Sequence, residues 1–249
     1  MVQPPIADSC AIKALKRSAI SAFQHPEIAE ELARYLPISV RQLSKGKYLH
    51  VVGEEVLFLH VMKRGWITSQ LDLADGERQL LNFHVPYDLV NMEYLGRATA
   101  GADLVAFEDS EVISVSIMDF KDAMVKSGEL SRAVTSYMSR QYGALQTRLS
   151  VFANGNAVTK VAHLIHGLRS KFEANGYDQL DRLDVSLTQS DIADTLGLTN
   201  VTVSRAFAAL RKSGCVDFKP GQIHILDHNA LLANADGVLE TMPVVDRFG

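Results

Sequence analysis

The sequence is short of the residues that mark several classes of protein. It has two cysteines among 249 residues, Cys10 and Cys215, too few for a disulfide framework or for an iron–sulfur cluster held by four thiolates. No apolar run approaches the roughly 20 residues that cross a membrane, and the first twenty residues lack the apolar core of a secretory signal. These absences predict a soluble, cytoplasmic protein.

An excess of basic residues is also missing. The chain has 25 lysines and arginines against 29 aspartates and glutamates, a formal net charge of −4, which argues against a nonspecific basic coat for nucleic acid. Backbone amides, helix N-termini and hydroxyls can still hold phosphates locally. Any DNA binding is therefore expected to be sequence-specific and to depend on dimerisation.

Hydrophobic spacing divides the chain into a β-rich front and a helical back. Two helical pieces separated by Pro26 are predicted over about 8–36, followed by six to eight short strands between about 40 and 116. This density of strands favours a small barrel or jelly roll over a βαβ sheet. A short helix is predicted at 119–126.

A long helix is predicted over about 129–152, and it carries one continuous apolar stripe. At about 1.5 Å per residue it is about 36 Å long, more than a small barrel covers. Pairing with the same helix of a second copy is therefore expected, and Asn154-Gly155-Asn156 predicts a hinge after it. The predicted dimer interface consists of Val134, Met138, Tyr142, Leu145, Leu149 and Phe152.

The stretch from 187 to 227 has the spacing of a helix-turn-helix followed by a two-stranded wing. Thr188 and Asp191 form a capping box at the start of the first helix. Gly197 comes four residues after Ala193 and supplies the turn. Thr199 then caps a second helix, predicted over 200–212. After it, two strands at 216–218 and 222–226 flank a turn at Pro220-Gly221.

The second of these helices suits the major groove of DNA, because short polar side chains and an arginine near its N-terminus can reach base edges. Lysine on the wing is expected to hold phosphate. The predicted DNA-binding residues are Thr188, Ser190, Thr199, Asn200, Val201, Thr202, Ser204, Arg205 and Lys219.

The order of barrel, long helix, Asn/Gly hinge and winged helix resembles the bacterial Crp/Fnr transcription regulators. The most specific segments are GLTNVTVSRAFAALRKSG (197–214), PGQIHILD (220–227) and DGERQLLNFHVPYDLV (75–90). The resemblance implies an α+β fold. N-terminal helices and a cyclic-nucleotide-binding-like β-barrel (double-stranded β-helix or jelly roll) occupy 1–128, a dimerisation helix 129–154 and a winged helix-turn-helix 155–249. It also implies a homodimer that binds a palindromic operator in double-stranded DNA, has RNA polymerase as a partner and is not an enzyme.

The chain departs from the members that bind cyclic nucleotides. Those carry a Gly-Glu pair for the ribose and an Arg-Ser/Thr pair for the phosphate, whereas the matching positions here are Asn91-Met92 and Ala100-Gly101. Arg97 lies nearby. A phosphate pocket without its arginine loses its main charge partner, so the effector is expected not to be cyclic AMP. Candidate effector-binding residues are Asn91, Met92, Arg97, Ala100 and Gly101.

The reading helix also departs from many relatives. The resemblance implies that Arg205 contacts guanine O6 and N7. Many relatives place a glutamate, which accepts a hydrogen bond from cytosine N4, where this chain has Val201. Valine offers only apolar contact, so the preference at one operator position is expected to be lost or to change.

Three alternatives stay open at this stage. The first concerns His50, His60 and His84, which lie in the barrel, where a lone histidine is more often hydrogen-bonded than bound to heme. No cofactor or metal is therefore predicted. The alternative is a sensor of heme or another small molecule that belongs to the same family. His163 and His166 have no third ligand nearby and are interpreted as surface or interface residues. A cupin-like enzyme would need a His-x-His that the barrel lacks. A winged-helix adaptor for protein contacts is the third alternative.

Overall fold

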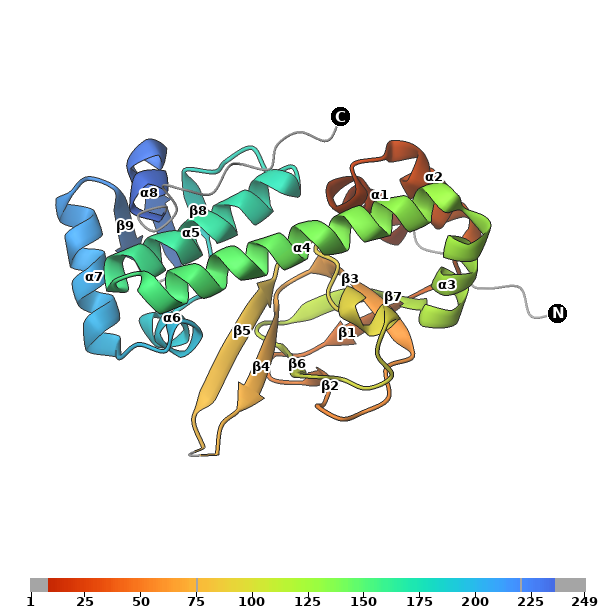
Figure 1. Ribbon diagram of the computed structural model, residues 1–249, viewed down its shortest axis with the longest axis horizontal. Helices are drawn as coiled ribbons and strands as arrows, with labels where there is room; N and C mark the ends of the chain where they lie inside the picture. Colours follow the sequence, from red (N-terminus) through yellow and green to blue (C-terminus); the bar gives the residue numbers. More distant parts are fainter. Residues whose placement is uncertain (1–8, 75, 220, 236–249) are drawn as a thin grey trace. The chain divides into compact units, whose positions relative to one another are not determined.

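The computed structural model describes residues 9–74, 76–219 and 221–235 (Figure 1). The predicted turn residues Asp75 and Pro220 lie outside these ranges. The chain divides into two units, one of Met1–Gln141 with Lys171–Asp178 and the other of Tyr142–Ser170 with Gln179–Gly249. Among the described residues, no helix is both long and apolar enough to cross a membrane.

The first unit begins with the two predicted helices, α1 (Ser9–Phe23) and α2 (Pro26–Tyr35). Pro26 stands at the start of α2, where its fixed φ suits a helix and its missing N–H costs nothing. Seven strands follow among the described residues, within the predicted six to eight. They are β1 (Ile38–Leu43), β2 (Tyr48–His50), β3 (Phe58–Arg64), β4 (Ile67–Asp72), β5 (Arg78–His84), β6 (Asp103–Ala106) and β7 (Ser110–Ser116).

These strands form two antiparallel sheets, with the orders β1-β7-β3 and β2-β6-β4-β5. Strand alternation gives β3 and β7 of the first sheet side chains buried on both faces. Leu59 and Val115 pack with the N-terminal helices on one face, while Met62 and Val112 pack between the sheets on the other. The predicted small barrel or jelly roll is therefore confirmed, and its interior is filled by side chains. A short 3₁₀ helix, η1 (Met92–Leu95), connects β5 to β6.

After the barrel come α3 (Ile117–Lys126) and the long helix α4 (Gly128–Asn154). The prediction of one uninterrupted long helix ending at the Asn/Gly segment is confirmed. Val134, however, is only 4% exposed and belongs to the core of the first unit together with Leu130 and Ala133. Its place in the predicted dimer interface is therefore corrected, because it is already buried within one copy.

The second unit contains most of α5 (Ala157–Ala174), followed by α6 (Gln189–Leu196), α7 (Asn200–Lys212) and α8 (His228–Ala235). Its sheet has the order β8-β10-β9. The two predicted wing strands are β9 (Val216–Lys219) and β10 (Gln222–Ile225). The third strand, β8 (Arg182–Asp184), pairs with β10 and was not among the strands predicted from the sequence. The predicted two-stranded wing is thus confirmed, and β8 extends its sheet to three strands.

Candidate nucleic-acid interface

The corner between α6 and α7 is built as its sequence predicts. The Thr188 backbone N–H donates to Asp191 Oδ2 at 2.9 Å, and the Asp191 N–H donates to Thr188 Oγ1 at 3.2 Å, which completes the capping box. Gly197 ends α6 with φ +61°, a left-handed conformation that a side chain would strain. These contacts fix where α7 begins.

Helix α7 has one buried and one exposed face. Val203, Ala206, Phe207 and Leu210 are buried against the rest of the unit. The opposite face contains most of the predicted reading residues. Asn200, Val201, Ser204 and Arg205 are exposed there, and Thr202 is half-buried. The exposed face is therefore largely polar, and Val201 is its large apolar residue, at 60% exposure.

Three of the predicted DNA-binding residues also stabilise the fold. The Thr202 backbone N–H donates to Thr199 Oγ1 at 3.2 Å, and the two hydroxyls lie 2.8 Å apart, so this pair caps α7. Thr188 Oγ1 donates to Asp191 Oδ2 at 2.6 Å. Ser190 and Thr188 are exposed at the start of α6. Both helix starts thus present backbone N–H groups and hydroxyls, which suit phosphate oxygens.

The wing is tied to the reading helix through Arg211. Its Nη2 pairs with Asp217 Oδ1 at 2.5 Å and donates to the Phe218 carbonyl at 3.2 Å. The Phe207 and Phe218 rings stack with their centroids 4.6 Å apart. Lys219 stays 61% exposed, 3.8 Å from Asp217. Lys219 is therefore positioned to reach outward, whereas Arg211 positions the wing, a role that the sequence did not reveal.

The candidate effector-binding positions are mostly used by the fold of the first unit. Asn91 is fully buried: its Oδ1 accepts from the His60 backbone N–H at 2.9 Å, and its Nδ2 donates to the Phe58 carbonyl at 3.0 Å. Met92 and Ala100 belong to the core beside the N-terminal helices. The side chains of these three residues therefore form part of the folded core of the first unit, and their contact with a ligand stays a prediction.

The other two candidate positions lie close together. An added Cβ at Gly101 would lie 2.8 Å from Arg97 Nη1, so the guanidinium fills the space beside this glycine. The Gly101 N–H donates to the Tyr94 hydroxyl at 3.0 Å. Arg97 therefore places a cation beside Gly101, near the position of the phosphate-binding arginine in relatives that bind cyclic nucleotides. Arg97 is the only basic residue among the candidate effector-binding residues.

The barrel histidines are buried and hydrogen-bonded to one another or to serines. His50 Nε2 and His60 Nε2 lie 2.9 Å apart, and His60 Nδ1 lies 2.9 Å from Ser114 Oγ. Burial, together with neighbouring His50, lowers the pKa of His60 to about 3. His84 Nε2 lies 2.7 Å from Ser69 Oγ, and burial, together with the Lys171 charge, lowers the pKa of His84 to about 3. These imidazoles are therefore neutral at ordinary pH.

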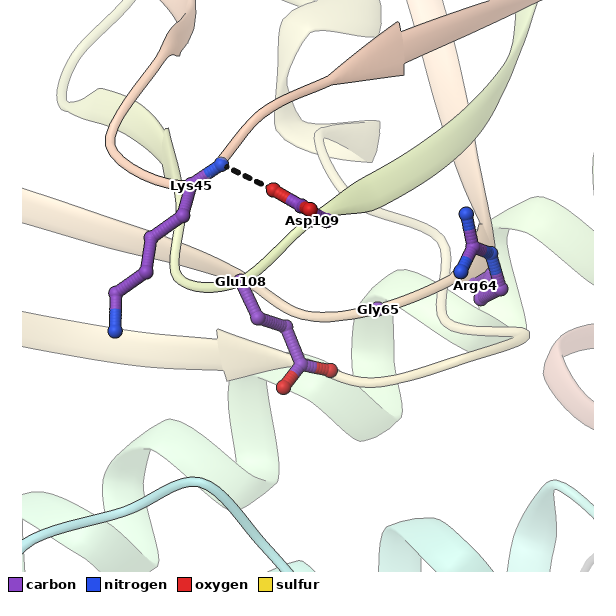
Figure 2. A pocket seen from close by; sticks show the side chains of 5 residues that line it. All are labelled: Lys45, Arg64, Gly65, Glu108 and Asp109. Carbon is purple, nitrogen blue, oxygen red and sulfur yellow. Dashed lines mark hydrogen bonds between the residues drawn. The ribbon is translucent and has the colours of Figure 1, made fainter.

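An open hollow of about 560 Å³ lies elsewhere on the first unit, lined by Lys45, Arg64, Gly65, Glu108 and Asp109 (Figure 2). The Lys45 backbone N–H donates to Asp109 Oδ1 at 2.9 Å. Figure 2 shows the Lys45 and Glu108 side chains on one side and the Arg64 guanidinium apart from them. Its charges are mixed and do not converge. Within the described ranges, no group of three or more His, Cys, Asp or Glu residues could hold a metal ion.

A side-chain-filled β-barrel, a long helix and a helix-turn-helix with an exposed polar reading face together define a two-part DNA-binding regulator. Comparison with known protein families agrees with this assignment. Residues 159–233 match the Crp-like helix-turn-helix domain, and residues 40–127 match the cyclic nucleotide-binding domain. These two matches cover well over half of the chain, which belongs to the Crp/Fnr family of transcription regulators.

The sequence identity to individual relatives is moderate. The chain is 26% identical over 200 residues to the transcriptional activator protein Anr of Pseudomonas aeruginosa, covering 80% of this chain and 82% of that protein. It is 27% identical over 191 residues to the fumarate and nitrate reduction regulatory protein of Escherichia coli K12, covering 77% and 76%. Among solved structures, FixK2 from Bradyrhizobium japonicum has the same fold, with a TM-score of 0.68, 20% identity and coverage of 78% and 96%.

Proposed function

We propose that this Crp/Fnr regulator acts as a homodimer on a two-fold symmetric operator. One observation carries the proposal: a stripe of exposed apolar side chains along α4. Met138, Tyr142, Leu145 and Leu149 are 37%, 63%, 52% and 61% exposed. Their spacing of four, three and four residues is that of a coiled-coil seam. Four large apolar side chains in a row on one helix face favour burial against an identical helix.

The end of the predicted interface is built differently. Phe152 is half-buried, with the Arg148 guanidinium 5.3 Å and the Lys160 ammonium 5.7 Å from its ring centre. Both cations lie within the distance of a cation–π contact. We therefore place the hydrophobic part of the interface between Met138 and Leu149, with Phe152 at its edge.

A dimer also explains how one reading helix per chain reads DNA. Two copies of α7 related by a two-fold axis would enter successive major grooves, about 34 Å apart. We propose that such a complex recruits RNA polymerase at promoters in the bacterial cytoplasm.

We further propose that the effector is not a cyclic nucleotide and that no heme is bound. Asn91, Met92 and Ala100 stand at positions that relatives use for ribose and phosphate, and here they complete the core. Both ring nitrogens of His60 have hydrogen-bond partners within the barrel, which supports a structural rather than a heme-ligating role.

The dimer is tested by exchanging one residue of the stripe for a charge. Leu145→Glu places a carboxylate in the seam, whereas Gln146→Glu adds the same carboxylate at the next position, also exposed but off the stripe. We expect light scattering at micromolar concentration to give a dimer for the wild type and Gln146→Glu and a monomer for Leu145→Glu. A wild type that remains monomeric, even with operator DNA, would overturn the proposal.

A further inference from the structure

Val201 is an exposed apolar side chain on the reading face, in the first turn of α7. It is 60% exposed, whereas Val203, two residues later, is fully buried in the core of the unit. A β-branched residue loses side-chain freedom in a helix and is a poorer helix former than alanine or glutamate. Neither packing within the unit nor helix propensity therefore explains a valine at this position.

Its neighbours on the helix are the polar reading residues. Ser204 and Arg205 follow Val201 by three and four residues, so the three side chains lie on one face with Cβ atoms about 5 to 6 Å apart. Ser204 and Arg205 are both exposed. Base pairs stack about 3.4 Å apart, so side chains at this separation reach base pairs one or two steps apart.

The chemistry of the major groove limits what a valine can recognise there. Guanine, adenine and cytosine present hydrogen-bonding atoms, while thymine also presents its C5 methyl group. Valine has no group that donates or accepts a hydrogen bond. In a helix its side chain keeps essentially one rotamer, so its two methyl groups are held in place before DNA arrives.

We propose that Val201 reads thymine in each half-site through contact with the C5 methyl group, within two base pairs of the guanine assigned to Arg205. This inference rests on the proposed function, because it requires α7 to enter the major groove. It names the base and the atom that the valine recognises.

The test separates the methyl group from everything else that a thymine offers. The full-length protein selects its operator from random duplex DNA, and each thymine of the half-site is then replaced in turn by deoxyuracil, which lacks only the methyl group. We expect the binding affinity to depend on the methyl group of one thymine in each half-site. Replacement of that thymine should weaken binding about fourfold in one half-site and about fifteenfold in both, the equivalent of one buried carbon group per half-site.

Two matched variants assign the effect to Val201. Val201→Ala should bind the thymine and uracil operators with nearly equal affinity. Val125→Ala makes the same change at a valine that is 87% exposed on α3, in the other unit, and should keep the full difference. If Val201→Ala keeps the difference, or if no thymine is sensitive to loss of its methyl group, the thymine assignment is wrong while DNA recognition stands. If random DNA yields no enriched sequence at all, the proposed function itself fails.

Discussion

Lys171 and Asp88 form an ion pair, with the lysine Nζ 2.9 Å from Asp88 Oδ2. The same ammonium donates to the Phe83 carbonyl at 2.6 Å and to Asn82 Oδ1 at 3.2 Å, so each of its three protons has an acceptor. Asn175 donates to the other oxygen of Asp88 at 2.9 Å. The segment Lys171–Asp178 is thereby fixed to the turn that follows β5 in the first unit.

Replacing Lys171 by methionine should lower the free energy of unfolding of this unit by about 2 kcal/mol, because Asp88 and the Phe83 carbonyl lose a charged donor in a partly buried place. Trp66, the single tryptophan, reports on it directly, since its ring packs 5.9 Å from Phe172 and 6.1 Å from Phe83. Urea unfolding followed by tryptophan fluorescence measures the loss.

The surface pair of Lys16 and Glu30 provides the control for this prediction. Lys16 Nζ lies 2.6 Å from Glu30 Oε2, but 60% of the glutamate side chain is exposed. Lys16→Met should therefore cost less than about 1 kcal/mol. Equal losses for the two lysines would contradict the role assigned to Lys171.

Tyr87 makes a second prediction possible because its backbone has φ +74°, a left-handed value that favours glycine. Its ring lies beneath the Arg17 guanidinium, 4.3 Å from ring centre to Cζ. Tyr87→Ala and Tyr87→Gly both remove this contact, but only glycine relieves the backbone. Tyr87→Gly should therefore be more stable than Tyr87→Ala by about 1 kcal/mol, measured as the difference in urea midpoints.

The same two substitutions at Tyr48, which is 45% exposed on β2 and has an ordinary negative φ, should give the opposite order. There glycine costs about 0.5 to 1 kcal/mol relative to alanine. An alanine variant at position 87 that matches or exceeds the glycine variant would show that the turn is not strained.

His84 makes the stability of the first unit depend on pH. Burial and the Lys171 charge lower its pKa from 6.5 to about 3, so the unfolded chain binds a proton between these values and the folded chain does not. Stability is therefore full above pH 6.5 and falls as the pH drops toward 3, by about 1.4 kcal/mol per pH unit. His84→Gln should lose about 1.4 kcal/mol less than the wild type between pH 7.5 and pH 5.5.

The exposed His25, just before α2, is the reference for this measurement. Each variant is compared with itself at the two pH values. A loss in the free energy of unfolding that glutamine causes equally at both pH values therefore cancels from the difference. If His84→Gln and His25→Gln show the same dependence on pH as the wild type, then His84 is not held neutral by the fold.

Local signals in the sequence predicted much of this architecture. Thr188, Asp191 and Gly197 act within a few residues of one another, so their pattern specified the helix-turn-helix corner directly. Val134 shows the limit of periodicity: an apolar stripe looks the same whether it meets its own barrel or a second copy. Strand β8 has three residues with no readable alternation, and it forms only because β10 pairs with it.

The sequence could not show how the fold uses the candidate effector positions. Alignment to the family placed Asn91 at the ribose contact, but it could not reveal that both ends of the Asn91 amide are used by the backbone of β3. Such a cross-link joins residues about thirty positions apart and depends on the register of the folded barrel. Arg211 was equally hidden, because its partners Asp217 and Phe218 lie on the wing.

On the reading helix, Arg205→Ala and Lys219→Ala should weaken binding in different ways. Loss of a bidentate contact to guanine should cost on the order of 1 to 3 kcal/mol per half-site and relax the preference at that guanine. Loss of a phosphate contact on the wing should weaken selected and scrambled DNA alike and reduce the salt slope by about one. Fluorescence anisotropy at several salt concentrations distinguishes them. Equal losses on both DNAs for Arg205→Ala would contradict its assignment to a base.

The last prediction concerns the effector. Cyclic AMP and cyclic GMP should neither bind the barrel tightly nor change DNA affinity, because a ligand shifts two conformations only by its differential affinity for them. The buried Asn91 and Met92 leave such a ligand without its ribose partner. Calorimetry with each nucleotide, run beside operator binding with and without it, measures both quantities. Micromolar binding coupled to a gain in DNA affinity of about fivefold or more, the lower end of ordinary allosteric coupling, would overturn the prediction. An absorption spectrum of the freshly purified protein tests heme in the same samples, since bound heme would give a Soret band.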